Sequence, residues 1–310
     1  MGVSGKKLCI VGYSWLTRAL SCWSLCKIAL KILCGLGIEE IAKSFLTNKE
    51  TINKRLLRAK KKLREQGVNW LSETSNYTPE QLDNVLHTLY LLFNEGYYSA
   101  NPKYPTNKEM CLEAMRLLIM ILNSAYNTSK SNALMALFCF HSSRFEARLT
   151  KNGEFILYDD QDTSLWNQEL IEKGEYYLNL SSGGNRVSTY HIEAAIAFWH
   201  TVTNDETTKW THILALYDQL LEAHYSPVIA LNKTYAFAKV HGNLAGYKDA
   251  KKLNLTDNHF YFMLLAELTQ DTKSKKEYLS KALKLASNIS DIQIIEKKLQ
   301  VTEVFLKNTV

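Results

Sequence analysis

The chain has 310 residues, of which 46% are hydrophobic and 22% are charged, with 13 Gly and 4 Pro. This length suits two ordinary domains or one long helical array, and the low Gly and Pro content excludes collagen-like, disordered and loop-rich all-β proteins. Six cysteines without a CxxC pair are too few for a disulfide scaffold, so we expect a reducing, cytoplasmic location.

The net charge of +6 is unevenly distributed. Residues 1–72 hold fourteen Lys and Arg against four Glu, a net of +10, which leaves a net of −4 for the rest of the chain. A basic head on a mildly acidic body indicates that the head is the part that meets a polyanion.

Residues 8–36 are apolar and superficially similar to a signal peptide or a membrane span. Arg18, Lys27 and Lys31 interrupt them, so no uncharged run reaches the ~18 residues that a span requires. No small-residue cleavage site stands out either. We therefore expect no membrane segment and interpret residues 1–27 as an atypical leader.

Residues 28–66 carry the pattern of a helix-turn-helix. One helix is expected to end at Gly35 or Gly37, where glycine supplies a left-handed cap. A short helix over 38–45 follows, with its apolar residues on one face, and then a tight connection at 46–48.

The next helix is expected over 49–65 and begins at a cap. Thr47 or Asn48 can accept the first free backbone N–H groups, and Thr47 with Glu50 fits a capping box. Spacings of four, three and four place four residues on a single apolar stripe: Ile52, Leu56, Ala59 and Leu63.

Polar and basic residues cover the other side of this helix. Glu50, Lys54 and Lys61 lie opposite the stripe, and Asn53 and Arg58 flank it. A short helix, a tight turn and a basic second helix are typical of a helix-turn-helix, whose second helix enters the major groove. The alternative is a solvated, Lys-rich surface helix.

Within such a helix, base reading falls to the N-terminal turn, because contacts to phosphates carry no sequence information. The predicted DNA-binding residues are Asn48, Lys49, Glu50, Thr51, Asn53, Lys54, Arg55, Arg58, Lys61 and Lys62.

Three short stretches carry a family resemblance: Ile38-Glu39-Glu40-Ile41-Ala42, Thr51-Ile52 and Arg55-Leu56-x-Arg58-Ala59-Lys60. Together they resemble region four of extracytoplasmic-function sigma factors, which belong to the sigma-70 family. The resemblance implies that this helix-turn-helix reads a −35 promoter element and touches the flap of RNA polymerase core. Asn48 falls where that family usually has a capping Ser.

Three later stretches are similar to the subgroup of these factors with a long, tetratricopeptide-like C-terminal extension: Leu89–Tyr97, Asp160-Gln161-Asp162 near Trp166, and Ser226–Asn232. Members of the family carry region two, which grips core polymerase and opens the −10 element, ahead of region four. Residues 1–27 do not look like region two. The resemblance therefore implies a truncated factor that does not melt promoters alone, and a possible protein partner for the extension.

A linker is expected at 67–78 and a helical extension over 79–310. The first helix of this extension is predicted from Pro79 to Asn94, with Gly96 as its C-cap. The alternative for Gly96 is a contact that docks the head on the body, as the resemblance implies. The expected inner face is Leu82, Val85, Leu86, Leu89 and Phe93.

Helices follow at 107–126 and 132–148, and then Asn152-Gly153 between two apolar runs predicts a hairpin over 149–158. Asp159, Asp160 and Asp162 lack EF-hand spacing, and we interpret them as a turn into the next helix rather than a cation site.

Further helices are predicted at 164–181, 189–202, 206–224, 227–240, 244–252, 257–269, 273–287 and 289–307. Stacked helix pairs of this kind bury a shared core and leave a surface suited to proteins or peptides. The expected fold is therefore all-α, a helix-turn-helix followed by a tetratricopeptide-like array with one small β-hairpin. A second hypothesis is an interaction scaffold with a vestigial DNA-binding head.

No P-loop, GxSxG, HExxH or dinucleotide fingerprint is present, and the eight histidines are scattered. The cysteines lack the partners of a tetrahedral metal site. We therefore predict no catalytic residues, no cofactor and no metal.

Overall fold

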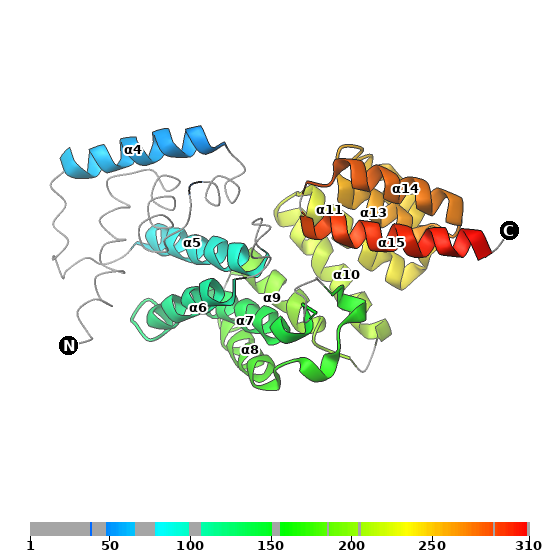
Figure 1. Cartoon of the computed structure of the whole chain (residues 1–310). Helices are drawn as coiled ribbons and strands as arrows, with labels where there is room; N and C mark the ends of the chain where they lie inside the picture. The colour runs from blue at the N-terminus through cyan, green and yellow to red at the C-terminus, as the bar shows by residue number, and fades with distance from the viewer. Residues whose placement is uncertain are drawn as a thin grey trace. The chain divides into compact units, whose positions relative to one another are not determined.

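The computed structural model describes residues 38, 48–65, 78–98, 107–150, 156–184, 186–203, 206–287 and 289–308. Within these ranges the regular structure consists of twelve α-helices and three 3-10 turns, without a strand. This part of the chain is all-α, as the sequence predicts (Figure 1).

The chain divides into two compact units, residues 1–138 and 139–310, with the boundary inside α7. The first four described helices are α4 (Lys49–Glu65), α5 (Pro79–Tyr97), α6 (Lys108–Leu122) and α7 (Ser129–Ser143). The remaining eight are α8 (Gln168–Ser181), α9 (Thr189–Trp199), α10 (Glu206–Ala223), α11 (Pro227–His241), α12 (Asn243–Leu253), α13 (His259–Leu268), α14 (Thr272–Leu285) and α15 (Ile289–Asn308).

Helix α5 forms because its start is capped and its inner face is apolar. Thr78 and Gln81 make a capping box, with the Gln81 N–H donating to Thr78 Oγ1 at 3.3 Å. Leu86 and Phe93 on the predicted inner face are fully buried. The Phe93 ring stacks on Phe138 of α7 with centroids 4.0 Å apart, which joins the two helices.

The prediction that Gly96 caps α5 is wrong, because the helix continues through it to Tyr97. A Cβ on Gly96 would lie 2.8 Å from the carbonyl oxygen of Asn107 and 2.8 Å from Sγ of Cys111. The Asn107 N–H also donates to the Gly96 carbonyl at 2.7 Å. Glycine is needed here because the start of α6 lies directly against α5.

Three predicted helix ends are shifted, two of them beside side-chain caps. Helix α7 begins before residue 132 because Thr128 caps it, accepting the Ser131 N–H at 3.2 Å. It ends at Ser143, and a 3-10 turn at Phe145–Ala147 replaces its predicted last turn. The helix predicted from 164 begins only at Gln168, after a 3-10 turn that Asp162 caps.

The predicted hairpin over 149–158 is only partly described. The Ile156 N–H donates to the Arg148 carbonyl at 2.8 Å, which links the two ends of this stretch. The turn at 151–155 lies outside the described residues, and Tyr158 begins a 3-10 turn instead of extending a strand.

The predicted helices from α8 to α15 are present with small shifts at their ends. From α8 to α15 each helix contacts the next one along the chain, and α11 also contacts α13. Gly242 joins α11 to α12 with φ at 88°, a conformation that favours glycine.

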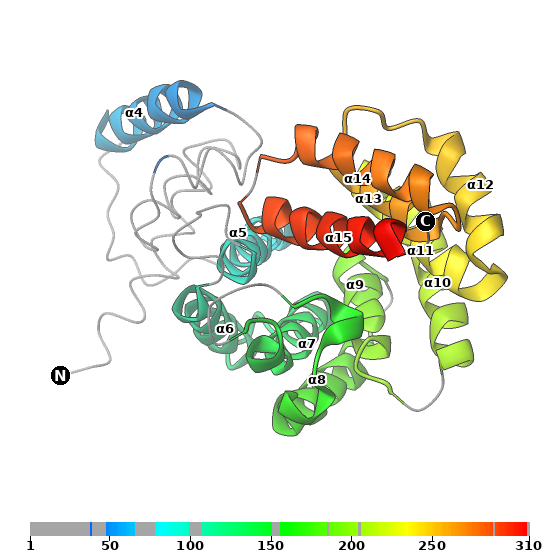
Figure 2. The same cartoon turned by 45° about the vertical axis from the view of Figure 1, so that its right-hand side comes forward.

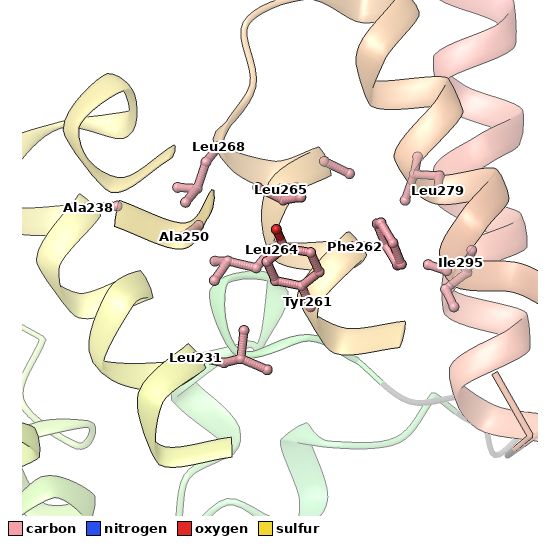
Figure 3. Packing of buried hydrophobic residues seen from close by; sticks show 12 residues of the cluster. Leu231, Ala238, Ala250, Tyr261, Phe262, Leu264, Leu265, Leu268, Leu279 and Ile295 are labelled. Carbon is pink, nitrogen blue, oxygen red and sulfur yellow. The ribbon is translucent and has the colours of Figure 1, made fainter. Parts of the chain in front are cut away.

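Apolar residues of α11 to α15 form a shared core in the second unit. Figure 3 shows Leu265 beside Tyr261 and Phe262 of α13, with Leu279 of α14 and Ile295 of α15 beyond them. Figure 2 shows α14 and α15 side by side, and α14 also contacts α13. Burial of these side chains supplies the main driving force for stacking the helices.

The expected leader at 1–27, nearly all of the first two helices of the helix-turn-helix and the linker up to residue 77 lie outside the described residues. None of the described helices is both long enough and apolar enough to cross a membrane.

Candidate nucleic-acid interface

Helix α4 has the bounds that the sequence predicts and begins at a side-chain cap. The Thr51 N–H donates to Asn48 Oδ1 at 2.8 Å, and the Ile52 N–H donates to the Asn48 carbonyl at 3.2 Å. Asn48 is therefore the N-cap. Thr47, the other predicted cap, lies outside the described residues.

The apolar stripe of α4 is buried where its side chains are described. Ile52 is 0% exposed and Leu56 is 6% exposed. The side chains of Ala59 and Leu63, the other two members, lie outside the described set. Leu57 is 69% exposed, so one large apolar side chain of α4 faces solvent.

The polar side of α4 is open to solvent. The predicted residues that are exposed are Asn48, Lys49, Glu50, Lys54, Arg55, Arg58 and Lys61. Thr51 and Asn53 are half-buried, and the Lys62 side chain is outside the described set. Six of the candidate residues, 48–51 and 53–54, thus lie close together at the start of α4.

Lys54 and Glu50 form an ion pair across one turn of α4, with Nζ and Oε1 2.7 Å apart. The two side chains are 64% and 76% exposed, so solvent screens the pair and it contributes at most ~1 kcal/mol. Such a weak pair can open when a phosphate approaches. Glu50 in the first turn also interacts favourably with the helix dipole.

The second unit contains a buried lysine that sequence reasoning did not predict. Lys209 of α10 is only 2% exposed, and its Nζ donates to the Tyr158 hydroxyl at 2.8 Å. The Arg144 guanidinium carbon lies 5.4 Å from the centre of the same ring. Lys209 stands in a polar stretch that reads as surface, and only its neighbour Trp210 suggests burial.

Several ionisable groups of the second unit are shifted toward their neutral forms. Burial, reinforced by the charges of Arg144 and Lys209, lowers the pKa of His200 to about 3. Burial also lowers the pKa of His141 well below its usual value and raises the pKa of the Cys139 thiol to about 12. These groups are therefore neutral at pH 7, and the thiol is not a nucleophile.

The acidic residues that follow the hairpin segment lie in or beside two 3-10 turns. Asp162 Oδ1 accepts the Ser164 N–H at 2.9 Å, and Tyr158–Asp160 forms a 3-10 turn. Across the described ranges, no three His, Cys, Asp or Glu side chains are grouped so as to hold a metal ion.

Residues 81–182 match the model of DUF6596, a family of unknown function. This match covers helices α5 to α8 and leaves out α4. The chain is also similar to an uncharacterized protein of Rhizobium meliloti (strain 1021), with 30% identity over 279 residues. That alignment covers 88% of this chain and 66% of the relative, so the chain spans just under two thirds of the relative's length. No solved structure matches the chain.

Proposed function

We propose that this chain binds promoter DNA through α4 and acts in transcription initiation, as its resemblance to extracytoplasmic-function sigma factors implies. The observation that carries the proposal is the division of α4 into two sides. Ile52 and Leu56 are buried, while Lys54, Arg55 and Arg58 are exposed. A helix anchored along one side with cations on the other meets the geometric needs of a recognition helix.

The start of α4 also supports this proposal. In a helix-turn-helix the N-terminal residues of the second helix contact base edges. Asn48 caps α4 at the predicted turn, and this bond fixes where the helix starts. The exposed residues Lys49 and Glu50 therefore have defined positions on its first turn. We propose that the polar residues among 48–54 face the bases of a −35-type element and that Arg58, Lys61 and Lys62 contact phosphates.

Leu57 supports a second contact within the same proposal. Its side chain is 69% exposed on a helix whose other described apolar residues are buried. We propose that it meets the flap of RNA polymerase core. Residues 79–310, in this proposal, form a tetratricopeptide-like extension that modulates the DNA-binding head.

Salt-dependent binding tests the DNA assignment. The full chain is titrated into labelled duplex DNA at several salt concentrations, and fluorescence anisotropy gives log K against log salt. Lys54→Ala and Arg58→Ala should each weaken binding, and each lost phosphate contact should reduce the slope by about 0.9.

Lys173→Ala is the matched variant. Lys173 pairs with Glu169 across one turn of α8, with exposures of 55% and 76% that resemble those of the Lys54 pair. This variant should bind DNA like the unaltered chain. Equal losses from Lys54→Ala and Lys173→Ala, or negligible DNA affinity at low salt, would reject the proposal.

An interaction scaffold is the second candidate, and α15 favours it. Val301, Val304 and Phe305 of α15 are 66%, 58% and 60% exposed, at the spacing that lines one helix face. A solenoid ends in a polar outer face unless something covers it. If the scaffold function holds alone, protein capture should depend on residues 200–310 and DNA affinity should be trivial.

A further inference from the structure

A short segment of the second unit is held by side chains far along the chain. Tyr158, in the 3-10 turn Tyr158–Asp160, donates its hydroxyl proton to the His200 carbonyl at 2.7 Å. The same hydroxyl accepts from Lys209 Nζ at 2.8 Å. The phenol hydroxyl thus donates one hydrogen bond and accepts another.

The ring of Tyr158 is enclosed as well. The His200 ring meets it edge-on at 4.9 Å between centroids, and the Trp166 ring lies 6.2 Å away. Lys209 Nζ lies 5.1 Å from the ring centre, within the range of a cation–π contact. A phenylalanine would keep the ring contacts but would leave the Lys209 ammonium without this hydroxyl, so these contacts select tyrosine.

The next residue is recognised by its charge. Asp159 Oδ2 accepts from the Tyr235 hydroxyl at 3.0 Å and from Lys239 Nζ at 3.3 Å. Lys239 also lies over the rings of Tyr235 and Trp210, which fixes its direction. Asp159 is 54% exposed on its side chain, so this end of the contact is open to solvent.

Two adjacent residues, a tyrosine and an aspartate, are thus bound by side chains of α10 and α11. These side chains lie 51 to 80 positions further along the chain. The segment itself supplies a single 3-10 turn and belongs to no α-helix. It therefore contacts the helices in the way that a bound peptide contacts its receptor. The side-chain contacts determine which two residues fit.

We propose that Lys209, Tyr235 and Lys239, together with the His200 carbonyl, form a docking site for a partner peptide that carries a tyrosine followed by Asp or Glu. Tyr158 and Asp159 occupy this site in the free chain as an intramolecular competitor. A tethered segment has an effective concentration of the order of millimolar. A free peptide must compete with it for the site and therefore binds the unaltered chain only weakly. This inference is independent of DNA binding by α4.

A peptide that copies the segment tests the proposal. A labelled Ile-Leu-Tyr-Asp-Asp-Gln-Asp peptide, the sequence of 156–162, is titrated into the full chain by fluorescence anisotropy. The chain with Tyr158→Ala and Asp159→Ala has an emptied site and should bind the peptide at least about tenfold more tightly than the unaltered chain. The same peptide with Phe for its Tyr should lose most of this affinity.

Two comparisons locate the binding. Adding Lys239→Ala to the emptied chain should abolish the gain, whereas adding Lys252→Ala should leave it, because Lys252 pairs with Asp249 on a different helix. Equal peptide affinity in the emptied and unaltered chains, or a gain that survives Lys239→Ala, would overturn the proposal.

Folding is checked by circular dichroism and thermal melting of each variant. Should loss of the Tyr158 side chain prevent folding, Asp159→Asn replaces the double variant, since Asp159 is largely exposed. It should still raise peptide affinity about threefold, because one charge-assisted contact of the tethered segment is lost. No gain from Asp159→Asn in a folded chain would also overturn the proposal.

Discussion

Gly246 of α12 lies directly against Ala238 of α11. A Cβ on Gly246 would overlap the Ala238 Cβ and lie 2.9 Å from its Cα, which is backbone and cannot turn aside. The close approach brings α11 and α12 together beside the core that contains Ala238 and Leu268.

Gly246→Ala should therefore destabilise the second unit. Alanine favours a helix over glycine by ~1 kcal/mol, but overpacking of a tight contact costs about 1–3 kcal/mol, so we expect a net loss. Urea unfolding followed by circular dichroism measures it. Gly183→Ala should be nearly neutral, because a Cβ there would come no closer than 3.8 Å to its nearest neighbour, the Leu180 carbonyl oxygen. An unchanged stability of Gly246→Ala would contradict the tight contact.

Stability should fall as pH falls below about 6.5, because of His200. Its pKa is about 3 in the folded chain and near 6.5 when unfolded. Between these values the unfolded chain binds a proton that the folded chain does not, so this contribution is complete above pH 6.5 and is lost toward pH 3. The slope from one such group approaches 1.4 kcal/mol per pH unit.

Urea unfolding at pH 7, 6 and 5 measures that slope in the unaltered chain and in His200→Gln. The substitution removes the titrating group, so the slope should become shallower whatever the stability of the variant at pH 7. His141, whose pKa is also lowered by burial, should supply the slope that remains. Identical slopes in the two chains would show that His200 is not kept neutral by the fold.

Asn48→Ala should loosen the start of α4. Loss of the bond from the Thr51 N–H to Asn48 Oδ1 costs ~1 kcal/mol at a typical N-cap. Hydrogen–deuterium exchange of peptides covering 48–56 should become faster, while exchange in α13 stays the same. Asn48→Ser keeps a capping oxygen and should restore slow exchange. Fast exchange in both variants would mean that the cap does not hold the helix.

Two substitutions on α4 should separate base contacts from phosphate contacts. Lys61→Ala should weaken binding to all duplex sequences equally and reduce the salt slope by about 0.9, as loss of a phosphate contact does. Asn53→Ala should instead change the ranking of sequences, because an amide can read a base edge. Binding to a library of duplexes measures both effects, and matching sequence profiles for the two variants would contradict this assignment.

Local patterns were enough to predict most of the described helices, and in α4 they also predicted the cap and the buried face. Asn48 caps α4, and Ile52 with Leu56 forms a buried stripe, because a cap bond spans three residues and a stripe repeats every three or four. The predicted end of α5 failed at Gly96, since glycine suits both a left-handed cap and a close helix contact. Only the position of Asn107 and Cys111 decides between these roles.

The sequence by itself therefore determined which segments are helical, where α4 begins and which of its sides is cationic. The tertiary structure alone decided that Lys209 is buried and that Tyr158 and Asp159 rest on α10 and α11. The physical reason is range. Helical hydrogen bonds and side-chain periodicity act over a few residues and are written in local sequence. Contacts between residues 51 to 80 positions apart exist only after helix packing has brought them together.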